Sequence, residues 1–319
     1  MERSSSQREI LYIGLNQDHS CICFGTNQGF EVHTIEPFKL KYERIFRGGI
    51  GIIEVLFRSN IVVLVGGGKK PEYPPNKVIF WDDNQSKCFA ELAFNSNVTG
   101  IKIKRDKIII SIQSKVYVYN FADLKLINYV ETTNAKGTIA CSYDPIHELL
   151  ACPSSIPGQV ILTYNDFINI YLINAHQHQI SFLAFNWDGT RLATASEQGT
   201  IIRIWDTHTY QQVIELRRGK DSAEINCISF SKDGNLLCVS SNTGTIHVFN
   251  LTPSVPEQSS YFTNLAGYIP FSVGEYMTSN CSFTKINLPP LTKYLCTFIE
   301  GQQNIIVIGQ DRSYNVHSY

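Results

Sequence analysis

The sequence predicts an all-β protein, a seven-bladed β-propeller, on three observations. Short runs rich in Val, Ile, Tyr and Phe alternate with turns of Asn, Asp, Gly and Ser, and helical periodicity is nearly absent. Residues 188–206, DGTRLATASEQGTIIRIWD, recur as residues 233–250, DGNLLCVSSNTGTIHVFN, at an offset of 45 (233 − 188). Seven units of about this length account for the 319 residues, so we expect one propeller over 1–319 and no second domain.

Each expected blade is a quartet of strands. The seven quartets are expected at 10–45, 50–92, 98–130, 137–173, 180–216, 225–288 and 294–319. In the fifth and sixth, Gly199-Thr200 matches Gly244-Thr245, and the glycines are expected to serve the turn into the next strand. The fifth carries one extra residue after its Gly-Thr, which sets Arg203 opposite His247.

Composition limits the possible functions. A net charge of -1 gives no basic face for a nucleic-acid partner, and 43% hydrophobic residues are ample for a core. The N-terminus MERSSSQREI lacks the apolar segment of a signal peptide, and no run reaches the ~18–20 apolar residues of a spanning helix. Nine scattered cysteines without a Cys-x-x-Cys pair fit a reducing compartment. We expect a cytoplasmic protein that is soluble or peripheral to a membrane.

No catalytic motif stands out, so we expect no enzyme, no cofactor and no metal site. The sequence lacks His-Glu-x-x-His, Gly-x-Ser-x-Gly and Gly-x-x-x-x-Gly-Lys-Ser/Thr. Asp82, at the end of a Trp-Asp strand, is expected to be a structural hydrogen-bond acceptor. His176 and His178 have no third metal ligand nearby in the sequence.

Two adjacent arginines, in ELRRGKD at 215–221, carry the sharper signal. Side chains alternate along a strand, so Arg217 and Arg218 should point in opposite directions and could serve two anion pockets at one turn. Gly219 would allow the bend. Hydroxyl side chains plus a cationic or potentially cationic group surround them in both repeats, which is the chemistry that holds a phosphate. The alternative is that both arginines are solvated loop residues.

Leu216-Arg217-Arg218-Gly219 resembles the Phe/Leu-Arg-Arg-Gly motif of the PROPPIN family, the WD-repeat proteins interacting with phosphoinositides. Residues 175–206 resemble a WD40 repeat, and 73–83, 115–126 and 194–207 also look family-like. YPPNKV, within 73–83, resembles the branch nearest the family's third and fourth human members. The resemblance implies a seven-bladed propeller that binds phosphatidylinositol 3-phosphate and phosphatidylinositol 3,5-bisphosphate. Carried over by position, it gives a blade 5 set of His176, Thr194, Ser196, Thr200, Arg203 and Arg217, and a blade 6 set of Arg218, Ser241, Thr245 and His247.

An overlong connection at about 252–281, in blade 6, is the second membrane signal. Loops of this length are functional or disordered, and aromatic and aliphatic side chains suit a membrane interface. The resemblance implies that this loop faces and inserts into the bilayer; the alternative is that it packs back on blades 5 or 6. Cys281 departs from the large aromatic that relatives often carry there. The inserting side chains would be Tyr261, Phe262, Leu265, Tyr268, Ile269 and Phe271.

The expected function is therefore that of a phosphoinositide-binding effector in autophagy. It would act on autophagosomal precursor, endosomal or vacuolar membranes and recruit the autophagy machinery. By resemblance, its protein partner would be the autophagy lipid-transfer protein. The rival is a WD-repeat protein-interaction scaffold without lipid binding, in which the arginine pair is dispensable. If His176 and His247 contact phosphate, binding should strengthen as the pH falls through their titration near ~6.5.

Overall fold

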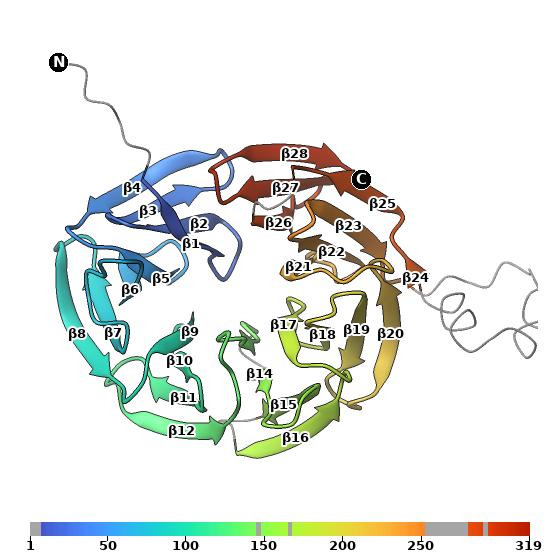
Figure 1. Cartoon of the computed structure of the whole chain (residues 1–319), viewed down its shortest axis with the longest axis horizontal. Coiled ribbons are helices and arrows are strands. Elements are labelled where there is room, and N and C mark those ends of the chain that lie inside the picture. Colours follow the sequence, from blue (N-terminus) through green and yellow to red (C-terminus); the bar gives the residue numbers. More distant parts are fainter. Residues whose placement is uncertain (1–7, 145–147, 165–167, 253–279, 290–292) are drawn as a thin grey trace, which may run out of the picture.

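The propeller predicted from the repeats is confirmed (Figure 1). The structure is a computed structural model that describes residues 8–144, 148–164, 168–252, 280–289 and 293–319. Seven small antiparallel sheets surround a central channel, and successive strands of each blade run from the channel outward. Within the described residues, no helix is long and apolar enough to cross a membrane.

The first four blades follow the expected quartets closely. Blade 1 holds β1 (Ile10–Leu15), β2 (Cys21–Thr26), β3 (Gly29–Thr34) and β4 (Lys39–Ile45). Blade 2 holds β5 (Ile50–Val55), β6 (Ile61–Gly66), β7 (Lys77–Asp82) and β8 (Lys87–Ala93). Blade 3 holds β9 (Val98–Ile103), β10 (Lys107–Ile112), β11 (Lys115–Asn120) and β12 (Leu126–Glu131). Blade 4 holds β13 (Ala140–Cys141), β14 (Leu150–Pro153), β15 (Gln159–Tyr164) and β16 (Asn169–Asn174).

The last three blades differ from simple quartets. Blade 5 holds β17 (Ile180–Phe185), β18 (Arg191–Ser196), β19 (Ile201–Asp206) and β20 (Gln212–Arg217), and a fifth strand, β24 (Asn280–Cys281), pairs with β20 in parallel. Blade 6 holds β21 (Ile225–Phe230), β22 (Leu236–Ser241), β23 (Thr245–Asn250) and, after the long connection, β25 (Thr284–Asn287). Within the described residues blade 7 has three strands rather than four, β26 (Tyr294–Phe298), β27 (Asn304–Gly309) and β28 (Tyr314–Ser318). Blade 1 keeps all four of its own strands and supplies none to blade 7 within the described residues.

The core lies between the blades, because each middle strand is apolar on both faces. β10 (KIIISI) and β22 (LLCVSS) are buried almost throughout, whereas outer strands such as β12 and β16 are mostly exposed. One face of blade 5, through Leu192 and Trp205, packs on blade 4. Its other face, through Ile202 and Leu216, packs on blade 6.

Glycines complete two of the turns in the way the repeat predicts. Gly199 and Gly244 have φ of +60° and +73°, in the left-handed region that favours glycine. A Cβ on Gly199 would lie 1.9 Å from the carbonyl oxygen of Ala223, so the next blade also requires a glycine there.

Candidate functional site

The two arginines lie at the end of β20, the fourth strand of blade 5, and their side chains point to opposite sides of the blade. Arg217 is directly opposite Ile201, and Leu216, one residue earlier, belongs to the core shared with blade 6. Alternation therefore places Arg217 on the face toward blade 4 and Arg218 on the side toward blade 6. Arg218 is 8% exposed, and its Nε donates to the Gly199 carbonyl at 2.7 Å. Its Nη2 also donates to the backbone carbonyl of Asp221.

Gly219 is not required for the bend, contrary to the sequence-based expectation. Its φ is outside the left-handed region, and an added Cβ would meet nothing within 4 Å. The chain instead leaves β20 through backbone hydrogen bonds, since Arg218 N–H donates to the Thr200 carbonyl at 2.9 Å. The turn thus depends on pairing with the start of β19 and not on the missing side chain.

Register brings most of the blade 5 set onto one face. Thr194 is opposite Arg203, and Arg203 is opposite Glu215, two residues before Arg217. Directly opposed residues, and residues two apart, share a face of the sheet. Ser196 belongs to the same face by that alternation and is buried at the end of β18.

A hydrogen-bonded chain connects three residues of blade 5. Trp205 Nε1–H donates to the Thr194 hydroxyl at 3.0 Å, and His176 Nε2 lies 2.9 Å from the same hydroxyl. Thr194 is fully buried, so its hydroxyl hydrogen-bonds to His176 inside the protein and is not at the surface. Arg203 is anchored on both sides, by Nη1 donating to the Ala175 carbonyl at 2.7 Å and by Nε pairing with Glu215 at 2.9 Å.

Thr200 is the member of the blade 5 set that the register separates from the others. The extra residue noted in the sequence places Thr200 before β19, which begins at Ile201, whereas Thr245 begins β23. Ile201, not Thr200, therefore occupies the strand position of Thr245. The backbone carbonyl of Thr200 contacts Arg218, so Thr200 lies closer to the blade 6 arginine than its assignment implies.

The blade 6 set is compact. Ser241 Oγ lies 3.0 Å from Thr245 Oγ1, and His247 is two residues further along the same face of β23. Thr243, which the sequence analysis missed, lies 2.9 Å from Ser241 Oγ through its own hydroxyl. His247 Nδ1 is 2.9 Å from Ser282 Oγ, and among the described residues its buried Nε2 has no hydrogen-bond partner.

Both histidines are neutral at pH 7 in this structure. Burial, and then the neighbouring Arg203 guanidinium, lowers the pKa of His176 to about 4. Burial, and then Arg218 and Lys285, lowers the pKa of His247 to about 4. The expected titration near ~6.5 is therefore wrong for the unliganded protein, because it ignored burial and the arginines beside each ring. In both cases a neighbouring cation adds to the effect of burial.

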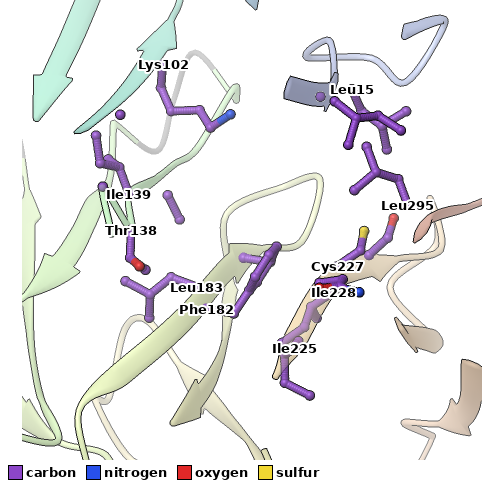
Figure 2. Close-up of a pocket in the computed structure, with 18 of the residues that line it drawn as sticks. Leu15, Lys102, Thr138, Ile139, Phe182, Leu183, Ile225, Cys227, Ile228 and Leu295 are labelled. Carbon is purple, nitrogen blue, oxygen red and sulfur yellow. The ribbon is translucent and has the colours of Figure 1, made fainter. Parts of the chain in front are cut away.

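The central channel is a separate feature. It contains a cavity of about 620 Å³ whose lining includes none of the predicted site residues. Figure 2 shows side chains that line it, and apolar ones from the inner strands, such as Leu183, Ile225 and Leu295, form much of the wall. The Lys102 ammonium at its edge is paired with the buried Glu54 carboxylate at 2.6 Å. The hydroxyl-plus-base clusters thus lie between blades and not in this cavity.

The predicted inserting side chains, Tyr261, Phe262, Leu265, Tyr268, Ile269 and Phe271, lie outside the described residues. The described part of that connection resumes with β24, where Cys281 is exposed and opposite Arg217. The end of the connection lies beside both sets of predicted site residues. β24 pairs with Leu216 and Arg217 of blade 5, and Ser282, the next residue, contacts His247 of blade 6.

The fold defines the class of the protein, a seven-bladed WD40-like propeller. The PROPPIN family model matches residues 10–310, and the chain belongs to that family. It is 35% identical to autophagy-related protein 18e of Arabidopsis thaliana over 98% of this chain and 84% of that protein. It is 36% identical to SVP1-like protein 2 of Schizosaccharomyces pombe over 76% of this chain and 68% of that protein.

Solved structures agree with this fold. Hsv2 of Kluyveromyces lactis superposes with a TM-score of 0.77 at 21% identity, covering 97% of this chain and 92% of that one. A complex of KlAtg21 with the coiled coil of AgAtg16 gives a TM-score of 0.77 at 22% identity, covering 97% and 94%. At these identities the likeness concerns the fold.

Proposed function

We propose that this protein is a phosphoinositide-binding effector of autophagy that attaches peripherally to membranes through two headgroup sites. The ligands are phosphatidylinositol 3-phosphate and phosphatidylinositol 3,5-bisphosphate. The blade 5 set forms one site and the blade 6 set the other, on autophagosomal precursor, endosomal or vacuolar membranes. The observation that carries the proposal is the divergence of Arg217 and Arg218 to opposite faces of blade 5. Arg217 shares a face with Arg203 and Thr194, and Arg218 lies on the side toward blade 6, which carries Ser241 and Thr245.

The roles within each site follow from the hydrogen bonds that each side chain already makes. Arg217 and Ser196 would contact the phosphate in the blade 5 site, with Arg203 as a second cation and His176 as a hydrogen-bonding group held by Thr194. Arg218, Ser241, Thr245 and His247 would do so in the blade 6 site. Thr200 is retained as a ligand of the blade 5 site, although its backbone contact to Arg218 gives it a place in either site.

Magnitudes explain why two sites and an inserting segment would act together. A charge-assisted hydrogen bond contributes roughly 1.5–3 kcal/mol net, and micromolar affinity requires about 8 kcal/mol. One site with two or three such bonds falls short or barely reaches this. Two sites on one membrane raise the effective concentration of the second headgroup. Insertion of the apolar loop at 252–281 would add a further contribution.

A protein-binding role is compatible with this proposal and is its second candidate. The similar KlAtg21 structure is a complex with a coiled coil of Atg16. We propose that the membrane-attached propeller recruits autophagy proteins in its turn, including the autophagy lipid-transfer protein. In the rival scaffold function, this recruitment would occur without lipid binding.

Vesicle flotation tests the proposal. Vesicles carrying phosphatidylinositol 3-phosphate should float the wild type; Arg217→Ala and Arg218→Ala should each lose part of the binding, and the double variant nearly all of it. Lys232→Ala, an exposed substitution in blade 6 away from the clusters, is the matched control and should bind as wild type. Undiminished flotation of a folded double variant would leave the scaffold function.

A further inference from the structure

The blade 5 set contains a carboxylate that the sequence analysis did not include. Glu215 is directly opposite Arg203, and its Oε2 lies 2.9 Å from Arg203 Nε. Glu215 is also two residues from Arg217 on β20, so both side chains share a face. The side chains of Arg203 and Glu215 are 26% and 24% exposed, so water screens this pair only in part. The acid therefore cancels one of the two arginine charges at this site.

The blade 6 set instead gains a cation. Lys285 of β25 is directly opposite His247 of β23, so both side chains share the face toward blade 5. Lys285 is exposed, and no carboxylate of the described residues lies within ion-pair distance of it. Asp221 contacts Arg218 through its backbone carbonyl, and the described residues include no ion pair between the two side chains.

The geometry around His247 also leaves a hydrogen-bonding atom for a ligand. Ser282 Oγ holds Nδ1 at 2.9 Å, and the buried Nε2 has no partner among the described residues. His247 is 4% exposed, so this nitrogen is an unsatisfied buried group in the unliganded protein. After burial, the charges of Arg218 and Lys285 both lower the pKa of this ring. Arg218 and Lys285, neither of which forms an ion pair within the described residues, thus act on the imidazole whose Nε2 has no partner there; the Asp221 carboxylate compensates part of the Arg218 charge.

We propose that the two sites divide the ligands by charge: the blade 6 site, with Lys285, prefers the doubly phosphorylated inositol headgroup, and Glu215 restricts the blade 5 site to the singly phosphorylated one. This inference rests on the proposed lipid-binding function. A phosphate monoester carries about −1.5 to −2 charges at pH 7, so a second one roughly doubles the charge that the site must neutralise. The Lys285 ammonium attracts a second phosphate in the blade 6 site, whereas the Glu215 carboxylate repels one in the blade 5 site.

Single-site variants provide the test. Arg217→Ala leaves the blade 6 site, and Arg218→Ala leaves the blade 5 site. Each is titrated with vesicles carrying either the 3-phosphate or the 3,5-bisphosphate lipid. The Arg217→Ala protein should prefer the bisphosphate by about fivefold or more, as one partly screened charge contact provides. The Arg218→Ala protein should show no such preference.

Two conservative substitutions then test the named residues. In the Arg217→Ala protein, Lys285→Gln should remove the preference for the bisphosphate, and Lys285→Arg should keep it. In the Arg218→Ala protein, Glu215→Gln keeps an oxygen for Arg203 and should raise bisphosphate affinity about fivefold. Soluble inositol phosphates bearing the same groups, with inorganic phosphate as competitor, separate headgroup recognition from attachment to the bilayer.

The outcomes are distinguishable. Equal preference in the two single-site proteins, or a Lys285→Gln variant that keeps the preference, overturns the division of ligands while the lipid-binding function stands. Failure of the folded wild type to bind either vesicle overturns both. Thermal unfolding of each variant verifies that the propeller is intact.

Discussion

The imidazoles of His176 and His247 illustrate how burial sets the chemistry of single residues in this protein. Each ring has a pKa of about 4 because burial disfavours the charged form and an arginine lies beside it. Both rings are uncharged at neutral pH, and their value to a ligand is directional hydrogen bonding. In the proposed sites the positive charge would come from Arg203 and Arg217 in blade 5, and from Arg218 and Lys285 in blade 6.

The depressed pKa values predict acid sensitivity of the fold. The folded-state pKa of about 4 lies below the ordinary value of 6.5, so the unfolded chain takes up these protons first. Stability is therefore fully present above about pH 6.5 and is lost as the pH falls toward 4. At pH 5 the loss is about 2 kcal/mol for each histidine. Urea unfolding at pH 7 and pH 5, followed by tryptophan fluorescence, measures it. His247→Gln should show a shallower dependence on pH, and an unchanged slope would contradict the assignment.

At the scale of the element, blade 5 is distinguished by the chain from Trp205 through Thr194 to His176. Blade 6 lacks this chain: Val239 and Phe249 occupy the positions of Thr194 and Trp205 and contribute to the apolar core instead. The two sites thus rest on different supports, one polar and one apolar. The Nε2 of His176 hydrogen-bonds to the buried Thr194 hydroxyl, whereas the Nδ1 of His247 hydrogen-bonds to the Ser282 hydroxyl.

Removing that hydroxyl should destabilise blade 5. Thr194→Val keeps the shape of the side chain but leaves the Trp205 N–H and His176 Nε2 without this partner. An unsatisfied buried polar group costs about 1–3 kcal/mol, so we expect a loss of roughly 2–4 kcal/mol in the free energy of unfolding. Thr194→Ser, which retains the hydroxyl, is the matched control and should lose about 1 kcal/mol. Equal stability of the two variants in denaturant unfolding would show that the chain is not a support.

The whole molecule is closed by contacts between its first and last blades. Arg312 makes a bidentate pair with Glu31, at 2.8 and 3.1 Å, and Phe38 stacks on Tyr314 with ring centroids 4.8 Å apart. Hydrogen bonding from His33, and then from Arg312, holds the pKa of Glu31 at about 2. Gln310 Nε2 donates to the Ile10 carbonyl at 2.9 Å. Side chains thus close the ring at this junction.

Arg312→Ala tests that closure. Glu31 is largely buried, so loss of its bidentate partner should lower the free energy of unfolding by roughly 2 kcal/mol, with a lower melting temperature. Lys232→Ala breaks an exposed pair with Glu300 and should cost less than about 1 kcal/mol. Similar melting temperatures for the two variants would show that Arg312 contributes no more than a surface charge.

The sequence predicted the blades better than it predicted the composition of the sites. The offset between two clear repeats gave blades 5 and 6, and the strand-rich spacing gave the remaining ones to within a few residues. The sequence could not place Glu215 opposite Arg203 or Lys285 opposite His247, because both pairings depend on strand register. Lys285 comes after a long connection, and nothing in the sequence specifies which residue of β23 it would oppose. The strand position of Thr200 also depends on register: a one-residue insertion places it just before β19, which begins at Ile201.

β24 has a mechanical consequence. The chain that leaves blade 6 after β23 returns along the outer edge of blade 5, pairs there with Leu216 and Arg217, and only then re-enters blade 6 as β25. A force that pulls on the chain before Asn280 would therefore act first on the pairing of β24 with β20 in blade 5. It would reach the pairing of β25 with β23 in blade 6 only after that contact had broken. Blades 5 and 6 are thus joined mechanically through β24, at the end of β20 that carries Arg217.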